Sequence, residues 1–160
     1  MVCAVKLRFI IVGRDRRDPL VTASGDYLDR IRHYHKVELV ELKEEPARAS
    51  APVARVRKVE AQRIAAAIAP GEHVVALDEG GKSVSSVQVA ARLDRWAMEG
   101  RGAVAFVIGG PNGLDREWLA RAPERWSLSK MTLPHRLARL VLMEQIYRGC
   151  TINRGEPYHK

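Results

Sequence analysis

Two kinds of hydrophobic pattern alternate along this chain of 160 residues. Short apolar or alternating runs predict strands, because strand side chains point alternately to two faces; they cover residues 5–11, 37–42, 73–78, 103–108 and 126–129. Apolar spacings of three and four predict helices over residues 19–34, 53–69, 85–99, 114–122 and 134–148. This alternation favours a three-layer α/β fold with a mostly parallel sheet, in a single domain over residues 1–160.

The last predicted helix is apolar on nearly all sides. Arg139 is its one polar residue between Leu137 and Met143, so more than one side of the helix must be buried. A second copy of the chain would cover the outer side, since two-fold dimers are the commonest oligomers. A central core helix in a monomer is the alternative. We expect Thr132 to cap this helix and Pro134 to begin it.

The chain is basic, with a formal net charge of +8 and a pI near 9.9. Residues 125–160 contain seven lysines and arginines against two glutamates, a net of +5. This concentration favours a polyanionic partner such as nucleic acid. A solvated basic surface is the alternative.

Other residue classes argue against metal and membrane functions. Cys3, Cys150 and five scattered histidines lack metal-ligand spacing, so no metal site is expected. Lys6 and Arg8 interrupt the apolar N-terminus, and no segment has the uncharged length of a membrane span. We expect a cytoplasmic protein with reduced thiols and no membrane partner.

Two loops follow predicted strands, at the sheet edge where parallel α/β proteins bind ligands. Residues 109–113 (Gly-Gly-Pro-Asn-Gly) allow close backbone approach to a ligand, with a structural turn as the alternative. Residues 127–133 expose backbone polar groups suited to an adenine edge or a carboxylate. Residues 81–83 (Gly-Lys-Ser) do not form a phosphate loop, because Ala76 stands where that motif needs glycine. We expect a tight surface turn there.

The sequence ends in Pro157-Tyr158-His159-Lys160. Proline stiffens such a tail, while tyrosine and histidine can stack on a base or transfer a proton. A frayed terminus is the alternative.

Taken together, these residues resemble the bacterial large-subunit ribosomal RNA methyltransferase H family of the SPOUT (α/β-knot) superfamily. The matching stretches are residues 75–78, 106–114, 127–139, 144–148 and 155–160. The resemblance implies a C-terminal trefoil knot, bound S-adenosylmethionine and a homodimeric active site. It also implies methylation of N3 of a pseudouridine in 23S rRNA within the assembled ribosome.

The resemblance also assigns roles to individual residues. The implied cofactor contacts are Leu77, Gly109, Leu128, Ser129, Lys130, Met131, Thr132 and Leu133. Tyr158 and His159 are catalytic candidates, because the family uses its tail on the substrate side, and they are hypothesised to remove the N3 proton. Arg154 and Lys130 are candidate RNA contacts.

Three other functions stay open at this point. The chain could methylate a different RNA, such as a tRNA. It could assist ribosome assembly or bind RNA without catalysis. A nucleotide-binding module is disfavoured by the failed phosphate-loop pattern.

Overall fold

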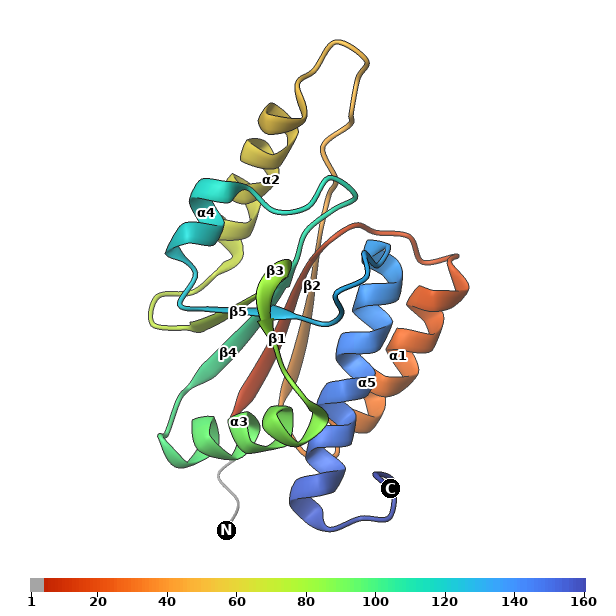
Figure 1. Ribbon diagram of the computed structural model, residues 1–160, viewed down its shortest axis with the longest axis vertical. Helices are drawn as coiled ribbons and strands as arrows, with labels where there is room; N and C mark the ends of the chain where they lie inside the picture. Colours follow the sequence, from red (N-terminus) through yellow and green to blue (C-terminus); the bar gives the residue numbers. More distant parts are fainter. Residues whose placement is uncertain (1–4) are drawn as a thin grey trace.

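The computed structural model describes residues 5–160 and contains, within that range, five strands alternating with five helices (Figure 1). In chain order they are β1 (Lys6–Val12), α1 (Pro19–Ile31), β2 (Val37–Leu42), α2 (Val53–Ala67), β3 (His73–Ser83), α3 (Ser86–Met98), β4 (Ala103–Ile108), α4 (Arg116–Arg121), β5 (Glu124–Ser127) and α5 (His135–Arg154). The prediction of alternating strands and helices is confirmed, although most boundaries differ by a few residues.

The strands form one parallel sheet in the order β2-β1-β4-β3-β5. Alternate side chains enter two separate cores. Phe9 and Phe106 face α1, α3 and α5, whereas Ile10 and Val107 face α2 and α4. Figure 1 shows the helices on the two sides of the sheet. The three-layer α/β prediction is therefore confirmed, and all strand carboxyl ends lie at one edge.

β3 is longer than predicted, and the turn expected at residues 81–83 is wrong. The strand bulges after Leu77 and pairs with β5 again from Lys82 to Ser83. A side chain at Gly81 would lie 2.7 Å from the backbone carbon of Trp126. Glycine is needed there for close approach of two strands rather than for a turn.

α5 also departs from the prediction at both ends. Thr132 does not cap it: Pro134 occupies the N-cap position without a side-chain cap bond, and the Thr132 hydroxyl donates to Glu79 at 3.0 Å. The helix continues past Arg148 to Arg154 and ends at Gly155, whose φ of 66° is the left-handed conformation that glycine tolerates. This gives α5 20 residues, or a length of about 30 Å.

Arg139, the polar residue in the apolar part of α5, is buried. Its guanidinium donates to the Ser24 hydroxyl at 3.0 Å and to Glu41 at 2.8 Å. Leu137, Leu140 and Val141 stay partly exposed.

In the described part of the chain, no helix is both long and apolar enough to span a membrane. Cys3 lies outside the described residues. Cys150 is a free thiol within the core beneath α5, and burial raises its pKa to about 12.

Candidate active site

A cleft of about 1210 Å³ opens at the carboxyl edge of the sheet. Its walls come from residues 77–80 after the regular part of β3, 108–114 at the end of β4 and after it, and 128–129, 131–136 and 138 around the start of α5. Both loops singled out by their sequence therefore face the same space. Seven of the eight expected cofactor contacts line it: Leu77, Gly109, Leu128, Ser129, Met131, Thr132 and Leu133. Lys130 is exposed and does not line it.

The glycine loop is held tightly from within. The Gly113 amide donates to the Gly110 carbonyl at 2.9 Å. A side chain at Gly109 would lie 3.0 Å from the backbone of Gly113 and from Leu114. From α2, Arg57 donates to the Asn112 carbonyl at 2.6 Å. These contacts fix the backbone that faces the cleft, so a side chain at position 109 would displace it.

Glu60 lies behind the same loop. This buried α2 side chain accepts the Glu45 amide at 3.0 Å, and its second carboxylate oxygen has no hydrogen-bond partner in the described residues. A side chain at Gly110 would lie 3.2 Å from that oxygen. Burial raises the pKa of Glu60, because removal from water penalises the charged form.

The opposite wall is shaped by short polar contacts. The Ser127 hydroxyl donates to the Ser129 carbonyl at 2.8 Å, and the Met131 amide donates to the Ser129 hydroxyl at 3.0 Å. The Thr132–Glu79 bond ties this wall to the bulge of β3. Met131 is left 74% exposed, an apolar side chain available to a ligand in the cleft.

Four arginines line the cleft, and three of them lie outside α5: Arg57 on α2, Arg116 on α4 and Arg125 on β5. Among residues 5–160, none of the three has a carboxylate within 4.0 Å. Arg116 is the first residue of α4, where the helix dipole disfavours a cation. These positive charges are available to an anion. Sequence reasoning included Arg125 only in the basic stretch 125–160 and missed Arg57 and Arg116, because isolated arginines in separate elements form no motif.

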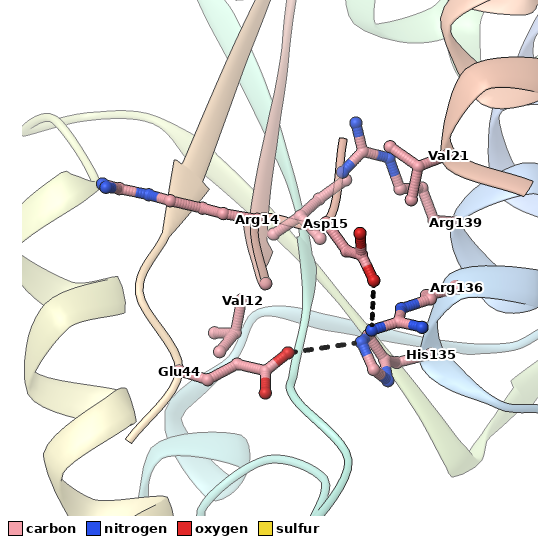
Figure 2. A pocket seen from close by; sticks show the side chains of 10 residues that line it. Val12, Arg14, Asp15, Val21, Glu44, His135, Arg136 and Arg139 are labelled. Atoms are coloured by element: carbon pink, nitrogen blue, oxygen red, sulfur yellow. Dashed lines mark ion pairs between the residues drawn. The ribbon is translucent and has the colours of Figure 1, made fainter. Parts of the chain in front are cut away.

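A small second pocket adjoins the cleft, and His135 and Arg136 line both (Figure 2). His135 Nε2 lies 3.5 Å from Glu44 Oε1. Arg136 pairs with Asp15 at 2.8 Å and with Asp18 at 3.0 Å. Burial lowers the pKa of His135, and the charge of Glu44 opposes that shift only in part. Its neutral imidazole is therefore favoured at neutral pH.

The predicted catalytic tail lies at the other end of α5 (Figure 1). The Tyr158 hydroxyl donates to Glu144 at 2.9 Å, and the guanidinium of Arg148 lies 4.7 Å from the Tyr158 ring centre. Burial, together with the hydroxyl of Tyr27 and the carboxylate of Glu144, raises the pKa of Tyr158.

His159 and Arg154, the last residue of α5, also contact their own chain at this end of the helix. His159 Nδ1 is 3.4 Å from Arg148, and Arg154 lies over the Tyr34 ring. The chain does not bring Tyr158, His159 or Arg154 to its own cleft.

Known proteins resemble this chain over nearly its whole length. The family model described as "Predicted SPOUT methyltransferase" matches residues 5–159. A protein named "Ribosomal RNA large subunit methyltransferase H" from Anaeromyxobacter sp. (strain Fw109-5) is 51% identical over 156 residues, covering 98% of this chain and 100% of the relative. The protein of the same name from Bacillus thuringiensis (strain Al Hakam) is 45% identical over 159 residues, with coverage of 98% and 100%.

A solved structure shares the fold at low sequence identity. It is titled "Crystal Structure of Probable Methyltransferase from Bordetella pertussis Tohama I" and has a TM-score of 0.58 at 17% identity. The match covers 91% of this chain and 96% of that one.

Proposed function

The chain belongs to the SPOUT methyltransferase family, and from that premise we propose that it methylates N3 of a pseudouridine in 23S rRNA on the assembled ribosome, with S-adenosylmethionine as methyl donor. The main observation in support is the single cleft onto which the loops after β3, β4 and β5 converge. We place the reaction in the cytoplasm, where ribosomes work, and propose that the C-terminal half is knotted as in the family.

The cleft lining fits this cofactor. Leu77, Leu128 and Leu133 offer an apolar wall for an adenine ring, and glycine backbone between them can approach a ligand closely. Asp78 and Glu79 put negative charge in the same cleft, complementary to a sulfonium cation. When bound, S-adenosylmethionine supplies a methyl group that is already activated. The protein must then hold the base in line and manage one proton.

The unpaired arginines of the cleft support an RNA substrate. Arg57, Arg116 and Arg125 can contact phosphates around a base inserted beside the cofactor, with Lys130 and Arg154 as further contacts. A loop base that is already unstacked would reach such a cleft most readily. The ribosome would provide the remaining recognition surface.

We further propose a two-fold dimer in which the tail of one chain completes the cleft of the other. The partly exposed Leu137, Leu140 and Val141 give α5 an apolar face for a partner. The tail folds back along α5, so Tyr158 lies beside Glu144 and His159 beside Arg148, about 14 and 20 Å along the helix from His135. Because neither residue lines the cleft of its own chain, we propose that both reach the target base in the cleft of the partner chain.

Labelled S-adenosylmethionine and three substrates test the proposal: intact ribosomes from cells lacking the gene, protein-free 23S rRNA, and tRNA. We expect label in the ribosomes only, mapped by mass spectrometry to N3 of one pseudouridine. Labelled tRNA would indicate the wrong substrate. If calorimetry detected no cofactor binding at all, a non-catalytic RNA-binding function would replace the proposal.

A further inference from the structure

We propose that His135, oriented by Glu44, accepts the N3 proton during methyl transfer. This inference rests on the proposed function and adds a catalytic pair that the resemblance did not assign. His135 is the one histidine among residues 5–160 that lines the cleft, and it lies in the first turn of α5, directly after the loop of expected cofactor contacts.

Three elements meet to build the pair. His135 comes from α5 and Glu44 follows β2, and Figure 2 shows the two side chains pointing toward each other. Gly13, which follows β1, lines the same pocket. A side chain at Gly13 would lie 3.1 Å from Glu44 Oε1 and 3.4 Å from His135 Nε2. The φ of Gly13 is +128°, which other residues rarely adopt. The glycine therefore leaves the space in which imidazole and carboxylate approach each other.

The nearby arginines form ion pairs with other carboxylates, so Glu44 is free to interact with His135. Arg136 binds Asp15 and Asp18, and Arg139 binds Glu41. Within residues 5–160, the one cation-forming group within 4.0 Å of the Glu44 carboxylate is His135.

Glu44 can also stay in place while His135 changes charge. Its side chain is 40% exposed, so the carboxylate remains solvated and can stabilise an imidazolium without a large burial cost. This is the arrangement of a base and its orienting carboxylate.

Other candidate bases are less suitable. Asp78 and Glu79 line the cleft, but a carboxylate is in general a weaker base than an imidazole, and Glu79 already accepts the Thr132 hydroxyl. The Tyr158 hydroxyl donates to Glu144, and its raised pKa disfavours the phenolate. Burial lowers the pKa of His135, so its imidazole is favoured in the neutral form that can accept a proton.

The proton transfer conserves atoms and charge. The N3–H proton passes to the imidazole of His135, and its electron pair stays on nitrogen. N3 forms a bond to the methyl carbon, while the carbon–sulfur bond breaks and leaves its pair on sulfur. The positive charge thus moves from sulfonium to imidazolium, beside Glu44. Solvent then takes the proton from His135.

Single-turnover rates on ribosomes across pH 5–9 test the assignment, alongside calorimetry of S-adenosylmethionine binding. For His135→Gln we expect a rate about 100-fold lower, with cofactor affinity near wild type and the fall in rate at acid pH abolished. His159→Gln should retain that acid limb. Glu44→Gln changes a half-exposed side chain, so it preserves the fold; it should move the acid limb to lower pH, because Glu44 raises the pKa of His135.

A direct readout separates chemistry from structure. NMR of labelled histidine should show His135 titrating below the ordinary histidine range, and lower still in Glu44→Gln. An unchanged rate and acid limb in His135→Gln would overturn the inference, as would a rate loss matched by a loss of cofactor binding. Wild-type protein inactive on ribosomes would instead overturn the proposed function.

Discussion

The two ends of α5 differ in how their polar groups are satisfied. Near its start, Arg116 and Arg125 have no ion-pair partner in the described chain, and Glu60 keeps an unpaired buried oxygen. From its middle onward, the tail folds back along the helix, and Tyr158 and Arg148 share Glu144 in a closed cluster. The first end is built to receive a ligand, whereas the second is satisfied by its own chain. In the proposed dimer, a tail that acts on RNA would exchange these contacts for new ones in the partner's cleft.

The largest expected effect comes from filling the cleft end. Gly109→Val should lower S-adenosylmethionine affinity at least ~100-fold, about 2.7 kcal/mol, because the new side chain would displace the loop backbone. Calorimetry measures this. Gly25→Ala is the matched control: its side chain would meet nothing within 4 Å, so affinity should not change. Normal binding by the valine variant would show that this loop is not the cofactor wall.

A mixing experiment tests whether the two ends meet between chains. Gly109→Val keeps an intact tail, while a chain shortened before Pro157 keeps an intact cleft. If the tail acts on its partner, co-expressed chains should recover about a quarter of wild-type activity, because half of the dimers are mixed and each has one complete site. Each variant by itself should be nearly inactive on ribosomes. Mixed dimers without activity would rule out completion of the cleft by the partner.

The unpaired arginines should show a smaller, salt-dependent effect. Replacing Arg57, Arg116 or Arg125 with glutamine should reduce the slope of log affinity for ribosomes against log salt by about 0.7–0.9 for each phosphate that is no longer neutralised. Arg101→Gln is the control, because that arginine is already paired with Glu99 at 2.9 Å. Equal slopes in all four variants would remove these residues from the RNA interface.

The sequence allowed the sheet to be predicted because its strands keep their own hydrophobic pattern, as residues 103–108 do. The Ser85 cap of α3 is likewise a local feature, because it is completed by Gln88 three residues later. Contacts between distant segments could not. Gly81 resembles a turn locally but is required by β5, and Thr132 bonds to a residue 53 positions away.

The candidate site also has one part that the sequence predicted and one part that depends on contacts between distant segments. The cofactor residues came from the family resemblance, and the structure brings all but Lys130 to one cleft. The distance of the tail could not be foreseen, because α5 continues through Gly149 and Thr151, which are weak helix formers held by packing. A side chain at Gly149 would lie 3.0 Å from Leu93 of α3, so the close approach of the two helices stabilises this turn. The pairing of His135 with Glu44 likewise depends on three distant segments.

The smallest expected effect concerns the unpaired carboxylate oxygen behind the glycine loop. Burial raises the pKa of Glu60 in the folded protein, so its carboxylate costs nothing below the unfolded pKa, where both states are protonated. The destabilisation by the buried charge appears as the pH rises from the pKa of Glu60 in the unfolded chain to its pKa in the folded protein. Above the folded pKa it stays constant. Glu60→Gln removes the charge, so it should raise the free energy of unfolding by about 1 kcal/mol at neutral pH and by little at pH 4. Denaturant unfolding at the two pH values measures the difference.

Glu99→Gln should show the opposite trend, because Arg95 and Arg101 lower the pKa of that carboxylate, and its stabilisation is present above the unfolded pKa and lost in acid. A Glu60→Gln variant that is less stable than wild type at neutral pH would mean that the carboxylate charge supports the loop, and that the cleft end is as fully satisfied as the tail.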